Sequence, residues 1–355
     1  MPGNPLLGVL FHWLGGLSSA TFYVPYRGVK RWSWEIFWLT GGVFSWLIAP
    51  WFFAAVQTND LLGVLSATPG STTLYCILFG TLWGFGGLTY GLTMRYLGLS
   101  LGMAVVLGLC TVFGTLIPPI FAGEFEAKLL GTVAGRINLL GLAITVAGIV
   151  VVALAGARKD ASLTAEAKAT AVAEFDFSRG IWVAIFSGIM SSCYAYGLAA
   201  GEPIRQLGAQ AGTGPLWLGL PVICLVTLGG LLTNGLWCGI LIARNRSAGQ
   251  WLGRDADAVT GERMPLARNY LLSALGGTLW YFQFFFYTMG ESQMGRFGFS
   301  SWTLHMASII IFGTIWGFAL HEWKGAAPRV RATVWAGVGL LVLATIVIGY
   351  GNSLG

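Results

Sequence analysis

Ten long runs of mostly apolar residues dominate this 355-residue chain and limit what it can fold into. A run of about 20 such residues is long enough to cross the hydrocarbon core of a bilayer as an α-helix. Most connections between the runs are short. We therefore predict ten transmembrane helices, with approximate ranges 5–24, 34–56, 72–96, 99–121, 137–156, 180–200, 215–242, 270–290, 299–321 and 332–352.

Charged residues are too few to coat a water-soluble protein. They make up 10% of the chain, whereas soluble domains contain about 25%. Lipid must therefore cover much of the surface. We predict an all-α integral membrane protein with a single transmembrane domain over residues 1–355, because the longest connections, 157–179 and 243–269, carry no pattern of a separate domain.

Basic residues are concentrated in the loops of one side. With ten spans, 16 of the 20 Lys and Arg residues fall in the loops that follow odd-numbered spans. Such loops stay in the cytoplasm, which puts both termini on the outer side of the membrane. Attraction of these loops to an anionic inner leaflet explains the net charge of +6, so we expect no nucleic-acid partner.

Two short sequence matches indicate an internal repeat. GTLW at 80–83 recurs at 277–280, and GGLSSATFY at 15–23 is similar to GIMSSCYAY at 188–196. They pair the third predicted helix with the eighth and the first with the sixth, which divides the chain into five-helix halves, residues 1–156 and 180–355. Because five is odd, the second half is inverted, as in secondary transporters whose binding site lies near the midplane.

A single glutamine, Gln283, interrupts the aromatic stretch GTLWYFQFFFYTMG at 277–290. Helical periodicity predicts one stripe containing this residue and Trp280, Phe284, Tyr287 and Glu291. We expect this stripe to face its repeat counterpart and to enclose a pocket with aromatic walls, a hydrogen-bonding amide and a glycine-lined recess. The counterpart stripe of the third helix consists of Trp83, Gly86, Gly87, Tyr90 and Met94.

Two interpretations of this stripe stay open. Aromatic residues on a membrane helix commonly serve packing or lipid contact, and a glutamine can bridge two helices for about 0.6 kcal/mol. An amide that faces lipid is costly, however, so at this depth it normally meets a partner or a cavity. We favour packing for the aromatic residues taken alone and a cavity for Gln283.

Two histidines also fall at membrane depth. His305, in the phrase SWTLHM, shares one side of the ninth predicted helix with Trp302, and His12 lies at a comparable depth in the first. Ionisable residues inside a membrane commonly mark a pathway or a proton relay, although a single histidine can be a hydrogen-bonded packing residue. We choose His305 as the proton-coupling group, followed by His12, with Glu291 or Glu35 as a carboxylate alternative.

Two opposite charges are predicted at the cytoplasmic ends of the second and third helices. Glu35 lies in KRWSWE and Arg95 in TMRYLG. The two side chains can pair as an inner gate. They can equally be interface anchors, as the neighbouring Trp32 and Trp34 suggest.

Motifs of ATP-driven transport and of enzyme catalysis are absent from the sequence. It contains no Walker A motif, HExxH or CxxC, and no pair of acids deep in the membrane. We therefore expect no ATP-driven step, no cofactor and no metal site. A membrane enzyme is the weakest interpretation, because His321 and Glu322 do not make a catalytic centre.

Long and rare phrases run through almost the whole chain. They are FHWLGGLSSATFYVP, VKRWSWE, YGLTMRYLGLSLG at 90–102, GTLIPPI at 114–120, LGGTLWYFQFFFY at 275–287, SWTLHM at 301–306 and EWKGA at 322–326. In these phrases the chain resembles the L-rhamnose-proton symporter family of the drug/metabolite transporter superfamily. It departs from the family in the loops at 157–178 and 243–268 and in ESQMGRFGF at 291–299.

The resemblance implies ten helices in two inverted repeats and proton-coupled uptake of a methyl pentose, such as L-rhamnose, across a bacterial inner membrane. A pyranose suits the predicted pocket, because its hydroxyls need both donors and acceptors and its C–H face can rest on aromatic rings. An uncoupled sugar facilitator or a metabolite exporter on the same fold is the alternative. The predicted substrate-binding residues are His12, Trp83, Gly86, Gly87, Tyr90, Trp280, Gln283, Phe284, Tyr287, Trp302 and His305.

The charge asymmetry predicts the topology of the chain. A periplasm-specific reporter fused to the C-terminus should be active, and a cytoplasm-specific reporter fused there should be silent, because the basic loops hold the other side in the cytoplasm. The opposite pattern would refute this orientation and the position of the inner gate.

Overall fold

Helices form all the regular structure of the residues that the computed structural model describes, which are 3–97, 99–161, 176–254, 264–321 and 323–354. The first half contains α1 (Pro5–Thr21), α2 (Tyr23–Tyr26), α3 (Trp34–Val43), the π-helix η1 (Phe44–Ile48), α4 (Ala49–Gln57), α5 (Leu61–Ala67), α6 (Gly70–Leu97), α7 (Leu99–Phe121), η2 (Phe125–Leu130) and α8 (Val133–Ala161). The second half contains α10 (Phe177–Ala200), α11 (Glu202–Gln210), η3 (Pro215–Trp217), α12 (Leu220–Asn245), η4 (Ser247–Leu252), α13 (Leu266–Gln293), η5 (Gly295–Ser300), α14 (Ser301–Ala319) and α15 (Pro328–Ser353).

Seven helical segments of the described residues are long and apolar enough to cross a membrane, and an eighth joins them if the bent pair α5 and α6 counts as one span. The seven are Pro5–Tyr26, Trp34–Gln57, Val133–Lys159, Ser178–Gln210, Pro215–Asn245, Gly298–Ala319 and Pro328–Ser353. The chain is thus an all-helical, multi-pass membrane protein. Helices also occupy the other predicted ranges, although α5 and α6 meet at 102°.

Side-chain caps fix where several helices begin. Asn4 precedes α1 and accepts a hydrogen bond from the backbone N–H of Leu7 at 3.2 Å. Asp60 and Asp176 cap α5 and α10 in the same way. Each cap accepts a hydrogen bond from one of the free N–H groups at a helix start, so these short polar residues stabilise the start of the helix.

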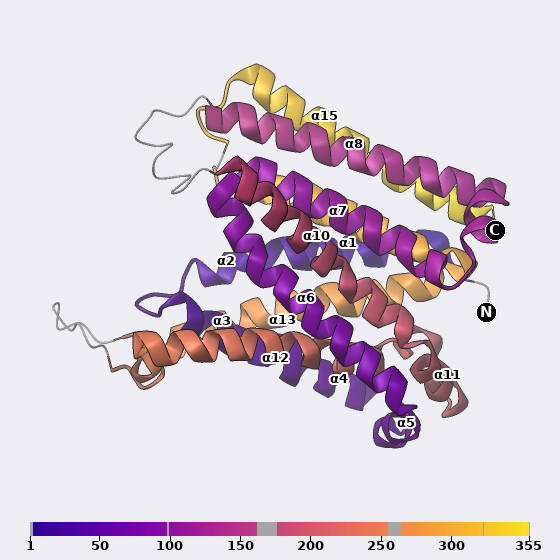
Figure 1. Ribbon diagram of the computed structural model, residues 1–355, viewed down its shortest axis with the longest axis horizontal. Coiled ribbons are helices and arrows are strands. Elements are labelled where there is room, and N and C mark those ends of the chain that lie inside the picture. The colour runs from indigo at the N-terminus through magenta and orange to yellow at the C-terminus, as the bar shows by residue number, and fades with distance from the viewer. Residues whose placement is uncertain (1–2, 98, 162–175, 255–263, 322, 355) are drawn as a thin grey trace.

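One helix of each half lies between two helices of the other. In the second half, α13 runs antiparallel to α1, because Gly8 meets Gly290 and Gly15 meets Gln283. α14 runs parallel to α1, because His12 bonds to Ser308 and Thr21 bonds to Trp316. In the first half, α6 runs antiparallel to α10 and α7 runs parallel to it. The helices α8 and α15 pair along one side of the molecule, and both chain ends lie at the same end of the bundle (Figure 1).

Glycines allow close contacts where α6 crosses α12. A Cβ atom added at Gly80 would collide with the backbone carbonyl of Val226, and one added at Gly229 would collide with that of Ile77. Small residues at such crossings let the two backbones approach, which membrane helices need because lipid supplies no hydrophobic driving force between them. The α6–α12 crossing therefore depends on glycine at these positions.

Substitution at this crossing should destabilise the fold. Gly80→Leu places a branched side chain against a carbonyl that cannot move without shifting α12, so we expect a loss of about 1–3 kcal/mol in stability. Gly91→Leu on the same helix is the control, because no atom lies within 4 Å of its Cβ position. Thermal unfolding in detergent compares the two, and equal midpoints would refute the packing role.

Candidate functional site

Aromatic side chains from three helices meet at the predicted stripe of α13. Phe284 stacks on Tyr194 of α10 with ring centroids 3.9 Å apart, and Trp83 of α6 lies 5.5 Å from Phe284. Trp280, one turn away on α13, lies 6.2 Å from Phe284. We refer to Trp83, Tyr194, Trp280 and Phe284 as the aromatic cluster, which joins both halves of the chain.

Two histidines, from α1 and α14, lie beside α13 one turn further along that helix. The rings of His12 and His305 have centroids 6.4 Å apart, and Tyr287 contacts both, at 5.3 Å and 5.4 Å. Trp302 lies 5.7 Å from Tyr287. These four residues form the histidine cluster, to which α1, α13 and α14 all contribute.

Glycines on the facing helices make room for the two imidazole rings. A Cβ atom at Gly290 would lie 2.8 Å from the ring of His12, and one at Gly15 would lie 3.2 Å from Cε1 of His305. Each ring thus occupies space that any larger residue would fill. The sequence thereby brings α1 close to both α13 and α14 at the level of the rings.

The histidine rings are polar groups without polar contacts. His12 and His305 are both completely buried, and all four of their ring nitrogens have no hydrogen-bond partner among the described residues. Buried polar atoms are nearly always paired, so each exception requires an explanation, and catalytic or transport roles are among the common ones. These imidazoles can exchange a proton or bind a polar ligand.

Further unpaired hydrogen-bonding atoms lie beside the aromatic cluster. Nε2 of Gln283, Nε1 of Trp280 and the hydroxyl of Tyr194 are buried and have no partner in the described part of the chain. Gln283 and Tyr194 are 3% and 0% exposed, so lipid contact does not account for these side chains. Together they provide an amide donor, an indole donor and a hydroxyl that both donates and accepts.

A very small cavity adjoins Trp280 on the side of α3 and η1. Its volume is about 10 Å³, which is close to the space that one water molecule requires. Ser45 and Trp46 line it together with Trp280, and Oγ of Ser45 and Nε1 of Trp46 are further buried atoms without a partner among the described residues. Buried polar atoms without a described partner near Trp280 therefore come from both halves of the chain.

Gly86 does not form the recess that the sequence predicts. A Cβ at Gly86 would meet the backbone N of Ser191 at 2.5 Å, and the carbonyl of Gly86 accepts a hydrogen bond from Ser187. Gly86 therefore faces α10 at a helix contact and does not open toward Gln283. Gly87 is exposed, and Tyr90 packs in a separate cluster with Leu97, Val106 and Ala184.

Trp302 lies where the sequence predicts, but its polar atom is already occupied. Its indole Nε1 donates a 3.0 Å hydrogen bond to the backbone carbonyl of Cys110 on α7. The indole thus fixes α14 to α7 and presents only its ring to the histidine cluster.

The proposed inner-gate residues do not have a described contact with each other. Glu35 is 4% exposed, and its Oε1 accepts hydrogen bonds from Asn245 Nδ2 at 3.1 Å and from Ser247 Oγ at 2.8 Å. Arg95 lies in α6, and its side chain is outside the described residues. The carboxylate of Glu35 therefore joins α3 to the end of α12 through neutral partners.

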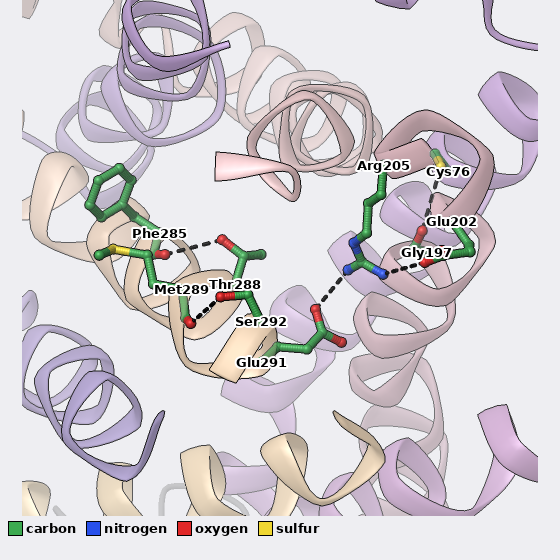
Figure 2. A network of polar contacts seen from close by, with 9 residues as sticks. All are labelled: Cys76, Gly197, Glu202, Arg205, Phe285, Thr288, Met289, Glu291 and Ser292. Atoms are coloured by element: carbon green, nitrogen blue, oxygen red, sulfur yellow. Dashed lines mark hydrogen bonds and ion pairs between the residues drawn. The ribbon is translucent and has the colours of Figure 1, made fainter. Parts of the chain in front are cut away.

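Glu291 has a cationic partner that the sequence analysis did not identify. Arg205 of α11 reaches across to α13, and its Nη2 lies 2.7 Å from Oε2 of Glu291 (Figure 2). Arg205 is one of the four basic residues outside the loops that we predict to be cytoplasmic, and this position was the sequence signal for it. Tyr194 is a second residue of the site that the sequence does not single out. It lies inside the repeated phrase GIMSSCYAY, which indicates only the repeat.

Comparison with known proteins identifies similar sequences along the whole chain. Residues 1–354 match the family described as L-rhamnose-proton symport protein. The chain is 36% identical over 346 residues to the L-rhamnose-proton symporters of Cronobacter sakazakii, Citrobacter koseri and Salmonella gallinarum, and each match covers 97% of both sequences.

The buried carboxylate of Glu35 yields a stability prediction. Glu35→Ala leaves Asn245 and Ser247 without their acceptor, so we expect a loss of about 1–3 kcal/mol in stability. Glu35→Gln keeps an acceptor oxygen and should lose less. Thermal unfolding in detergent measures both, and equal losses would show that the hydrogen bonds do not matter.

Proposed function

The chain belongs to the L-rhamnose-proton symport protein family, and from this premise we propose that it takes up L-rhamnose or a related methyl pentose together with a proton. The relatives carry the name of a symporter, which is a transporter and not an enzyme. Bacterial relatives make the inner membrane the natural location, with the bilayer, the sugar and the proton as partners. We retain the orientation with both termini in the periplasm.

We further propose ten membrane spans in two inverted five-helix halves, residues 1–156 and 180–355. The packing of α1 against α13 and α14, and of α10 against α6 and α7, supports this proposal, because each arrangement becomes the other when the halves are exchanged. α13 is less apolar than the seven segments because glutamine, tyrosine and tryptophan interrupt its apolar run, and these are residues that a polar substrate would require.

One observation carries the functional proposal. Buried polar groups without a described partner lie on and beside one stripe of α13. Gln283 and Tyr194 can bond sugar hydroxyls as donor and acceptor, and the ring of Phe284 can support the C–H face of a pyranose. The side chains of the described aromatic cluster carry no charge. They therefore suit a neutral sugar better than a sugar phosphate, which needs cationic partners.

The histidine cluster is our proposed proton site. Symport requires a group whose protonation changes sugar affinity, and the effect must be reciprocal. Two positive charges at the 6.4 Å separation of His12 and His305 would repel each other by about 2 to 3 kcal/mol at an effective dielectric constant of about 20. The pair is therefore suited to hold one proton at a time, and we propose a stoichiometry of one proton per sugar.

Transport by purified protein in proteoliposomes tests the function as a whole. We expect L-rhamnose to accumulate when the outside is made acidic and to equilibrate only when no pH gradient is imposed. Uptake that is equal under both conditions would favour a facilitator, and rhamnose efflux alone would favour an exporter.

The amide of Gln283 should contribute directly to sugar affinity. Gln283→Ala removes its hydrogen bonds and leaves sugar groups unpaired, so calorimetric titration should show binding weaker by about 1–3 kcal/mol. Gln210→Ala, which removes an exposed glutamine of α11, is the control and should bind like the parent. Parent-like affinity of a folded Gln283→Ala variant would place the sugar elsewhere.

The proton site should separate exchange from accumulation. His305→Gln keeps a polar side chain but cannot titrate, so it should still exchange sugar down its own gradient while losing accumulation driven by a proton gradient. His321→Gln, at an exposed position outside the spans, is the control. If His305→Gln concentrates sugar with the parent's pH dependence, His12 and the carboxylates become the candidates.

A further inference from the structure

A second and much larger cavity lies at the end of the bundle that carries the two termini. Its volume is about 420 Å³, and it is formed by α11, the connection from α11 to α12, the last turns of α13 and η5. α11 lies at the same end as the N and C labels (Figure 1). Six polar side chains line this outer cavity, namely those of Glu202, Arg205, Gln206, Thr288, Glu291 and Ser292.

An ion pair is held across this cavity. Arg205 Nη2 lies 2.7 Å from Glu291, and Arg205 Nη1 lies 3.5 Å from Glu202. Figure 2 shows the guanidinium directed from its helix toward Glu291 on the facing helix. The side chains of Arg205 and Glu291 are 17% and 24% exposed, so both are partly shielded yet reachable from the cavity.

This chemistry fits a small, neutral, polyhydroxylated molecule. A guanidinium donates several hydrogen bonds and carboxylates accept them, so the pair can bind neighbouring hydroxyls as donor and acceptor. A cavity of this volume falls within the range of about 300–1,000 Å³ that small-ligand sites occupy. Among its described lining residues, two carboxylates outnumber one guanidinium, which disfavours acidic sugars.

The outer cavity is adjacent to the proposed transport site. Glu291 follows Tyr287 by one helical turn on α13, and Tyr287 contacts both histidines of the histidine cluster. Thr288, which lines the cavity, follows Tyr287 directly in the chain. Only this turn of α13 separates the cavity from the buried cluster along the helix.

We infer that the outer cavity is a second monosaccharide site, in which Arg205 and Glu291 hold a neutral sugar before it passes to the buried clusters. The inference rests on the proposed function for the identity of the sugar, but not for the existence of the site. Its ligand class is a neutral hexose or deoxyhexose, and sugar acids are excluded by charge.

Protection from chemical modification tests the site directly. The five native cysteines are all buried, so a membrane-impermeant thiol reagent should react selectively with a Ser292→Cys variant. L-Rhamnose at ten times its dissociation constant should slow the reaction by about tenfold, because only the free fraction reacts. Ser353→Cys, exposed near the C-terminus, should react at the same rate with and without sugar.

A second variant separates direct occupation from a remote conformational change. In the Ser292→Cys background, Gln283→Ala weakens the proposed buried site, and protection by L-rhamnose should persist. Loss of protection in this double variant would overturn the outer site, because the effect would then originate at the buried site. Absence of protection in the single variant, with uptake intact, would also overturn it while leaving the proposed function in place.

Charge and space provide the matched controls. Galacturonate should not protect Ser292→Cys, but it should begin to do so when Glu202 and Glu291 are both replaced by Gln. Ala209→Trp fills the cavity from α11 and should abolish protection, whereas Ala211→Trp, exposed just beyond the lining, should not. Equal protection by galacturonate and L-rhamnose in the parent would overturn the assignment of a neutral sugar.

Discussion

Each backbone N–H and C=O group inside the hydrocarbon core must find its hydrogen-bond partner within the protein, because lipid offers none. This chain meets the requirement with helices throughout its described spans. The side chains are then left to provide everything else, which includes contacts between helices and any polarity at depth. A polar atom without a partner is costly in such a setting, so the ring nitrogens of His12 and His305, which have no partner among the described residues, support our proposal of a proton site there.

The helix positions could be predicted well because they depend on local composition. Every predicted range falls on a helical segment, although composition and length alone qualify only seven or eight of them as spans. The aromatic members of the α13 stripe could also be grouped, since helical periodicity fixes which residues share a face. Trp83, Trp280 and Phe284 do meet, and His12 meets His305.

The partners across helices could not be predicted in the same way. A repeat identifies which helices correspond but does not give the rotation of each helix about its axis, and this rotation turns Gly86 toward α10. Glu35 provides a second example, because the sequence suggested Arg95 as its partner, whereas its carboxylate accepts hydrogen bonds from Asn245 and Ser247. Arg205 lies on a short helix outside the main apolar runs, so no pattern linked it to Glu291, 86 residues away.

The π-helix η1, between α3 and α4, has a geometric effect on everything that surrounds it. A π turn is equivalent to an α-helix with one inserted residue, so it rotates the two flanking segments by about 100° relative to each other. The segment before η1 can thereby turn Glu35 toward α12, while the segment after it turns Phe53 toward Tyr281 of α13, where the rings stack at 5.6 Å. Deleting one residue from 44–48 would make α3 and α4 one continuous α-helix without this rotation. Either the face with Glu35 or the face with Phe53 would then turn away from its partner helix.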